Sequence, residues 1–285
     1  MNPLLRRIIA HIIFIPSWVF LRSYLKGKLI VFLFHDVTNK PSKHSELSKI
    51  WISEKRFLQS LIFINKFFLV HNPINPLESI QGEHRRIAMI TFDDCWLSIF
   101  RGIDICNKQF GNIPIMFING GTIMNQVDRS AQRLHKSNKS SVTLTEFQGQ
   151  LLTSDTLNEI DLFKDTVMAS HLFNHDRALT LSPEELKSQA QENLDFLSTY
   201  SSASSEYFAF PHGAREVDFN SQSIEIIQKV HQRVWIFSAD PGVNCVKEFD
   251  SKVLKRIHLT EENSKNLWIV YSIMRGILLN LRNRF

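Results

Sequence analysis

Two adjacent carboxylates end an apolar segment and could share the work of a hydrolytic site. Asp93 and Asp94 directly follow the apolar run Ile87 to Phe92. In parallel α/β folds the carboxyl ends of the strands face the active site, where neighbouring side chains point in different directions. One carboxylate could bind a metal while the other accepts a proton. A turn or a helix N-cap before Trp96 would explain the same pair without any chemistry, so the pair alone leaves both interpretations open.

Two histidines four residues apart follow a second apolar run. His171 and His175 come directly after residues 167–170, and one helical turn or a tight loop would bring both imidazoles to one face. They would then suit two ligands of a divalent ion, with a carboxylate from a distant strand as the third. With 11 histidines in the chain, such a pair is weak evidence alone. The zinc-protease motif is excluded, because it needs Glu where Leu172 stands.

Short apolar runs that alternate with helical patterns must position these residues. Helical periodicity covers residues 54–68 and 96–110, and Ser182 with Pro183 and Glu185 has the pattern of a helix start. Alternation of strands and helices predicts a parallel sheet or barrel. The predicted strands are Leu29–Phe34, Ile87–Phe92, Ile113–Ile118, Thr166–Ser170, Tyr207–Phe210 and Val234–Phe237.

Four short motifs, taken in order, resemble those of the polysaccharide deacetylases, carbohydrate esterase family four. The resemblance spans about residues 29 to 259, and each motif follows a strand-like segment. It implies an α/β fold, a distorted (β/α) barrel of the polysaccharide deacetylase type. The motifs are Phe34-His35-Asp36-Val37, Thr91-Phe92-Asp93-Asp94, the pair His171 and His175 followed by Leu179 to Leu186, and Phe208-Ala209-Phe210-Pro211-His212-Gly213.

The resemblance also implies roles for the residues that could do chemistry. Asp94, His171 and His175 would hold one divalent metal ion, most often zinc in this family, with cobalt or nickel as alternatives. Asp93 would be the catalytic base that takes a proton from the attacking water. A bound metal acidifies water and polarises a carbonyl, so a neighbouring carboxylate is a strong enough base near neutral pH.

The general acid has two candidates. His35 lies at the end of the first strand, and His258 lies in a stretch whose Arg256-Ile257 pair resembles the last family motif. Either imidazole could deliver a proton to the leaving amine, since its ordinary pKa is close to neutral. Asp36 is expected to orient His35 or to cap a turn. Contacts to the substrate are expected from Pro211, His212 and Gly213.

The chain departs from the family pattern at four positions. Leu172 stands where many members have Ser or Thr, and Cys95 replaces a Gly, where we expect it to pack at a helix start. Ala209 stands where many members carry an Arg that holds the base. His212 replaces an aromatic residue and is expected at the rim of the pocket or in contact with substrate. These departures motivate an alternative, a catalytically inactive barrel that binds glycan or serves as a scaffold.

The composition of the 285-residue chain indicates where it works. Its net charge is +5, with the excess at the two ends, which favours a membrane surface over nucleic acid as partner. Three scattered cysteines without a CxxC spacing indicate a reducing compartment. We expect a cytoplasmic protein, peripheral on the inner membrane; periplasmic placement is the alternative if the N-terminal segment is an anchor.

Three segments are expected along the chain. Residues 1–28 form an amphipathic basic segment, residues 29–262 the barrel with a polar insert at about 119–160, and residues 263–285 an amphipathic helix that covers the barrel or lies on a membrane. The predicted function is removal of N-acetyl groups from an N-acetylated glycan. The form of the histidine motif resembles deacetylases of bacterial surface polysaccharides or of their lipid-linked precursors. Deacylation of another amide or of an O-acetyl ester would use the same chemistry.

Overall fold

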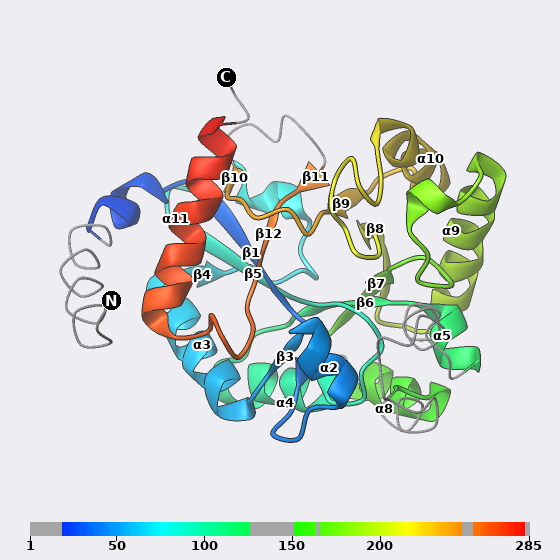
Figure 1. The fold of residues 1–285 in the computed structure, drawn as a ribbon, viewed down its shortest axis with the longest axis horizontal. Coiled ribbons are helices and arrows are strands. Elements are labelled where there is room, and N and C mark those ends of the chain that lie inside the picture. Colours follow the sequence, from blue (N-terminus) through cyan, green and yellow to red (C-terminus); the bar gives the residue numbers. More distant parts are fainter. Residues whose placement is uncertain (1–18, 126–150, 164–165, 247–252, 283–285) are drawn as a thin grey trace.

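The computed structural model describes residues 19–125, 151–163, 166–246 and 253–282 (Figure 1). Its centre is a sheet of parallel strands, each paired with the next along the chain. All six predicted apolar runs are strands, with bounds that differ from the prediction by a few residues. They are β1 (Lys28–Phe34), β5 (Arg86–Phe92), β6 (Ile115–Ile118), β7 (Val167–Ser170), β8 (Ala203–Ala209) and β9 (Trp235–Phe237).

A short segment near the end of the chain closes this sheet into a barrel. β11 (Val253–Leu254) pairs with β9, and β12 (Arg256–His258) pairs with β1, so only Lys255 separates the two pairings. This segment thereby connects β1, the first strand of the sheet, to β9, the last, and the predicted distorted (β/α) barrel is confirmed. Two minor strands also pair with strands of the barrel. β4 (Leu69–Val70) pairs with β5, and β10 (Asn244–Cys245) runs antiparallel to β1. β2 (Asp36–Val37) and β3 (Trp51–Ile52) form a separate ladder.

Helices surround the barrel. Two of the predicted helices begin where the sequence indicates, at Glu54 and after Ser182, whereas the helix predicted from Trp96 begins at Ile99. Ser182 accepts a hydrogen bond from the backbone N–H of Glu185, whose side chain bonds back, which is the predicted capping box at the start of α9. The helices are α2 (Lys43–Ser48), α3 (Glu54–Phe67), α4 (Ile99–Phe110), α5 (Gly120–Asn125), α8 (Ser154–Phe163), α9 (Pro183–Leu197), α10 (Ser221–His231) and α11 (Asn266–Arg282), with 3-10 turns at Leu77–Ile80 and Ala178–Thr180.

The barrel strands are apolar over most of their length, where both of their faces are buried, whereas the first half of β8 is polar and partly exposed. Alternate residues such as Val31, Met89 and Phe117 fill the barrel interior, and the residues between them pack outward against the helices. The interior is therefore a packed core, and polar chemistry is confined to the carboxyl ends of the strands.

The last helix, α11, packs against α3 and β12 (Figure 1). Ile269, Val270 and Ile273 are buried on its inner face, whereas Trp268 and Tyr271 are exposed on the other. Among the described residues, no helix is both long enough and apolar enough to cross a bilayer. Most of the predicted polar insert, residues 126–150, lies outside the described residues, and α5 and α8 flank it.

Candidate active site

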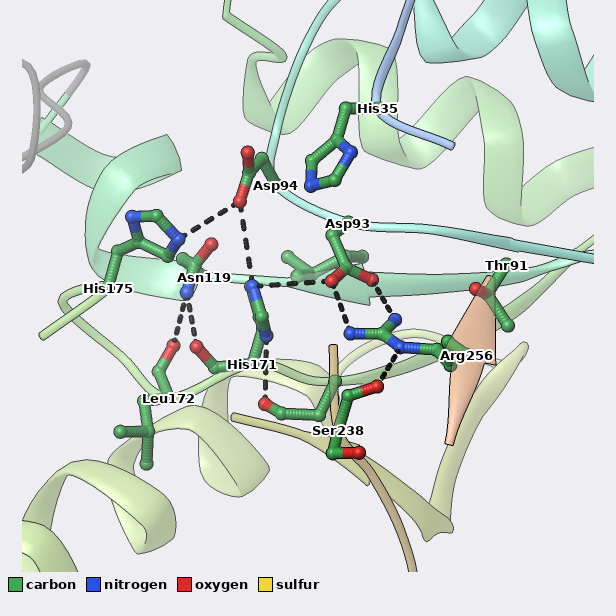
Figure 2. Close-up of polar contacts among 12 residues, drawn as sticks. His35, Thr91, Asp93, Asp94, Asn119, His171, Leu172, His175, Ser238 and Arg256 are labelled. Atoms are coloured by element: carbon green, nitrogen blue, oxygen red, sulfur yellow. Dashed lines mark hydrogen bonds and ion pairs between the residues drawn. The ribbon is translucent and has the colours of Figure 1, made fainter. Parts of the chain in front are cut away.

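The two predicted carboxylates lie directly after β5, at the carboxyl end of the barrel. The Asp93 N–H donates to the Phe34 carbonyl at 3.0 Å, which prolongs the pairing of β5 with β1. Asp94 then adopts a left-handed conformation with φ of 69°. This turn sends the two side chains apart, so that Asp93 points toward the barrel interior and Asp94 toward the histidines (Figure 2). Such a φ is strained for a residue other than Gly and is typical of functional sites.

Asp93 is held by a buried arginine that the sequence did not lead us to expect in this role. The Arg256 guanidinium donates to both carboxylate oxygens, with Nη1–Oδ1 at 2.6 Å and Nη2–Oδ2 at 2.7 Å. Its Nε donates to the Ser238 carbonyl at 2.9 Å, and its guanidinium lies 5.5 Å from the centre of the Phe117 ring. Arg256 is 1% exposed. Ala209 stands at the position where an arginine is expected to hold the base, and Arg256, on β12, provides this guanidinium instead.

The ion pair determines the charge of Asp93. Burial alone would raise the pKa of this carboxyl, but the charge of Arg256, with His171 nearby, lowers its pKa below the usual range. Asp93 therefore stays ionised at neutral pH. Its Oδ2 lies 3.9 Å from Nε2 of His171, so the carboxylate faces the histidine pair while Arg256 holds it from behind.

His171 and His175 converge on Asp94 from the loop after β7 (Figure 2). Nε2 of His171 lies 3.5 Å from the Asp94 Oδ1 atom, and Nε2 of His175 lies 3.0 Å from the same oxygen. One ligand atom from each of the three residues lies within 4.8 Å of the others. The loop takes this shape through two further positive φ angles, 59° at Leu172 and 56° at His175.

The hydrogen bonds of His171 indicate that a cation fits between these groups. Its Nδ1 is 2.8 Å from the Ala209 carbonyl, which can only accept, so Nδ1 carries the proton and the Nε2 atom of the neutral ring presents a lone pair. That lone pair faces a carboxylate oxygen, and the two would repel each other unless a proton or a cation lay between them. A single proton would remove the repulsion between one histidine and Asp94. A divalent ion could bind both histidines and Asp94 at once, and would remove the repulsion for all three. Two imidazoles and a carboxylate are ligands that zinc accepts, with a position left for substrate.

Asp94 is suited to this role by its charge. Burial would raise the pKa of its carboxyl, but His175 and hydrogen bonds from both histidines hold that pKa well below the usual range. The carboxylate is thus ionised at neutral pH, as binding of a cation requires.

A second unexpected residue, Asn119, holds the histidine loop in place. Its Nδ2 donates to the backbone carbonyls of His171 and Leu172, the latter at 3.0 Å. Its own backbone N–H donates to the Cys95 sulfur at 3.3 Å. Cys95 is buried beside the carboxylates, packed as expected from its size. Leu172 is also buried, in an apolar cluster beneath the loop, so it anchors the loop by packing where other sequences would use a hydroxyl.

The two general-acid candidates are in direct contact with each other. Nδ1 of His35 lies 3.1 Å from Nε2 of His258, and Figure 2 shows His35 beside both carboxylates. Burial lowers the pKa of His35, opposed in part by Asp94, and burial together with His35 lowers the pKa of His258 to about 3. In this contact one ring must donate and the other accept, so the pair shares one hydrogen-bonded proton.

Asp36 does not orient His35 by any hydrogen bond found among the described residues. Its Oδ1 accepts a hydrogen bond from the Ser98 hydroxyl at 2.5 Å, and that hydroxyl in turn accepts from the Val37 N–H at 3.2 Å. The carboxylate thereby ties β2 to the turn that begins α4. The expected turn-capping role is the closer description of its contacts.

The motif expected to contact substrate follows β8 and lies beside the histidines. The His212 ring is exposed, with its centre 5.0 Å from that of His175. Gly213 has φ of 74°, and a Cβ there would lie 2.8 Å from the backbone nitrogen of Ala239, so only Gly fits. Pro211 is buried and begins this turn. The position suits a pocket rim, and the substrate contacts themselves remain a prediction.

The sequence matches no protein-family model, and no curated protein matches it. Solved structures do match its fold. The deacetylase PplD from Streptococcus pyogenes, solved in complex with acetate, superposes with a TM-score of 0.64 at 13% identity, over 88% of this chain and 99% of that chain. A polysaccharide deacetylase from Bacillus cereus gives a TM-score of 0.61 at 12% identity, over 87% and 69%.

A third match is a de-N-acetylase from Aggregatibacter actinomycetemcomitans, with a TM-score of 0.62 at 12% identity, over 82% of this chain and 96% of that chain. At identities this low the TM-scores establish a shared fold and nothing more, and the matches cover 82–88% of this chain. The chain therefore has the fold of the polysaccharide deacetylases.

Proposed function

We propose that this chain is a metal-dependent hydrolase that removes N-acetyl groups from the sugars of a glycan. One observation carries the proposal: a cluster that could hold a metal, Asp94 with His171 and His175, lies beside a carboxylate that Arg256 keeps ionised. The substrate we propose is a bacterial surface polysaccharide or its lipid-linked precursor, as the motif resemblance implies.

The residues divide the reaction between them. When bound by Asp94, His171 and His175, a divalent metal such as zinc would polarise the acetamide carbonyl and acidify water. Asp93 accepts the proton that the attacking water loses. Its low pKa makes it a weak base, which is sufficient for a water already acidified, and its ion pair keeps it in the ionised form.

Release of the amine requires a proton on the sugar nitrogen. The His35–His258 pair lies beside the carboxylates and holds a proton between its two rings. Because burial lowers the pKa of both rings, we propose that the pair first takes over the proton that Asp93 gains from the water, and that the resulting imidazolium gives this proton to the nitrogen as the C–N bond breaks. The products are a free amino sugar and acetic acid, which ionises to acetate, and Asp93 and the histidine pair return to their starting protonation states.

The names of the structural neighbours agree with this chemistry. One is a deacetylase solved with acetate, the product that this reaction would release, and another is a de-N-acetylase. Leu172 and Ala209, two of the positions where the chain departs from the family pattern, both have a role in the structure. Leu172 packs in an apolar cluster, and the Ala209 carbonyl accepts a hydrogen bond from His171. These two departures are therefore weaker support for a catalytically inactive barrel than they are when only the sequence is considered.

The test is elemental analysis of the purified protein beside an acetate-release assay on N-acetylated glycans. We expect about one zinc, cobalt or nickel ion per chain, and joint loss of metal and acetate release in Asp94→Ala and His171→Ala. Asp195→Ala, which removes an exposed carboxylate on α9, is the matched control and should keep both. Full activity in His171→Ala would reject the proposed site. An inactive wild type that binds glycan even after metal is resupplied would favour the scaffold.

A further inference from the structure

A cavity of about 630 Å³ lies against α11 and shares two residues, Arg256 and His258, with the surroundings of the candidate active site. His258 and Arg256 line it from β12, and Trp268, Tyr271 and Arg275 line it from α11. Its volume is within the usual range for small-molecule and cofactor sites, about 300–1,000 Å³. The cavity therefore adjoins the candidate active site through Arg256, which holds Asp93, and His258, which contacts His35.

Two aromatic rings are displayed on the α11 side of this cavity. Trp268 is 46% exposed and Tyr271 is 56% exposed, and their rings meet edge to face with centres 5.7 Å apart. The opposite face of α11, including Ile269 and Ile273, is buried against the barrel. The helix is therefore fixed by its apolar face, and its aromatic rings are exposed on the side of the cavity.

The floor between the rings and the active site is polar and well held. Asn263 donates from Nδ2 to the His258 carbonyl at 2.9 Å, and its Oδ1 accepts from the Thr260 N–H at 2.6 Å. Glu262 lines the same cavity and pairs with Lys49 at 3.1 Å. Exposed Arg275 forms no ion pair with any other described residue, so its guanidinium donors remain open to a ligand.

An aromatic face beside fixed polar groups suits a sugar ring. A pyranose has an apolar face of C–H groups that packs on an aromatic ring, and an edge of hydroxyls that require hydrogen-bond partners. We propose that this cavity binds a sugar ring of the same glycan chain next to the one that is deacetylated, with Trp268 as the stacking platform and Arg275 as a donor to its hydroxyls. This proposal rests on the proposed function.

A lipid surface is the other partner that exposed aromatic rings can serve, because Trp and Tyr favour the interface of a bilayer. Two observations favour the glycan. The rings line a recess whose other wall contains His258 and Asn263, whereas a bilayer contact needs a protruding surface. The recess also presents Glu262 as well as Arg275, so it carries charges of both signs and lacks the cluster of basic residues that attracts anionic headgroups.

The kinetic test compares N-acetylglucosamine oligomers from the monosaccharide to the pentasaccharide as substrates. In Trp268→Ala we expect KM for the pentasaccharide to rise about tenfold, with a smaller effect on shorter substrates, since about one stacking contact is lost. Trp268→Phe should recover most of the loss. The control Leu278→Ala removes an exposed side chain from the same helix outside the cavity and should stay within about twofold of wild type throughout. An equal loss at every chain length, or none, would overturn the proposal.

A binding experiment separates this proposal from the proposed function. Saturation-transfer NMR of the full chain with the pentasaccharide should give signals that weaken in Trp268→Ala and persist in Leu278→Ala, whether or not acetate is released. An inactive wild type with this Trp268-dependent binding would reject deacetylation and uphold the sugar site. If both variants lose binding to phosphatidylglycerol vesicles while oligosaccharide binding is unchanged, the surface contacts lipid and the sugar site is rejected.

Discussion

Replacing Arg256 by Ala should destabilise the protein more than almost any other single substitution in the barrel. The guanidinium is 1% exposed, and it makes two hydrogen bonds to Asp93 and one to the Ser238 carbonyl. Its removal leaves the Asp93 carboxylate, 3% exposed, without its main counter-charge. Loss of one partner from a buried pair costs about 3–5 kcal/mol, a large share of the roughly 5–15 kcal/mol by which domains are stable.

Urea unfolding of chelator-treated protein at pH 7 measures this loss. We expect the midpoint to fall with little change in the slope, and the double variant Asp93→Asn with Arg256→Ala to recover part of the stability, because the unpaired charge is then gone. Arg85→Ala removes the guanidinium of an exposed pair with Glu83 and should change the midpoint little. A loss below about 1 kcal/mol in Arg256→Ala would refute the inferred energetic role of the ion pair.

The pH dependence gives an independent check of the same reasoning. In the wild type the pKa of Asp93 is lowered in the folded state, so its contribution to stability is present above the unfolded-state value of about 4 and is lost as the pH falls through the folded value. Without Arg256, burial raises the folded pKa above that of the unfolded chain. The penalty in Arg256→Ala should then be largest at neutral pH and shrink as the pH is lowered toward about 4. A penalty independent of pH would contradict this account.

Three further substitutions test the frame around the site. Asn119→Ala removes the donor that holds the histidine loop and should weaken metal affinity about 10–100-fold in a chelator competition. Ser182→Ala removes the N-cap of α9 and should cost about 1 kcal/mol in urea unfolding, with unchanged metal content. Gly213→Ala places a methyl group against the Ala239 backbone at positive φ and should cost at least about 1–3 kcal/mol, measured in the same way; a neutral effect would show that the turn can relax.

The long elements of the fold could be predicted from the sequence because their patterns are strong. β1 and β5 are apolar at nearly every position, as strands buried on both faces must be, and the start of α9 has Ser, Pro and Glu at the capping positions. The closing strands β11 and β12 have two and three residues, too few to show any periodicity. Only the pairing of this segment with both β9 and β1 reveals that it completes the barrel.

At the site, the motifs placed the carboxylates and the histidines, but not the residues that hold them. Arg256 was noted as part of a motif, yet its contact with Asp93 joins residues 163 positions apart and has no local signal. A weak signal was present in its surroundings, since an arginine that is buried along with Leu254, Ile257 and Leu259 needs a counter-charge. Asn119 gave less warning, because an Asn after a strand is common in turns.

The closure of the barrel by residues 253–258 also sets the order in which the site can form. As the chain is synthesised, both carboxylates and both histidines of the candidate metal cluster emerge well before the strand that carries Arg256 and His258. Until that strand docks, Asp93 has no counter-charge and the barrel has an open seam between β1 and β9. Docking pairs β12 with β1, a contact between segments far apart in the sequence, and such contacts tend to form slowly. Asp93 therefore gains Arg256, and His35 gains His258, in the same late step. A chain that ends before residue 253 would have the metal ligands but no competent active site.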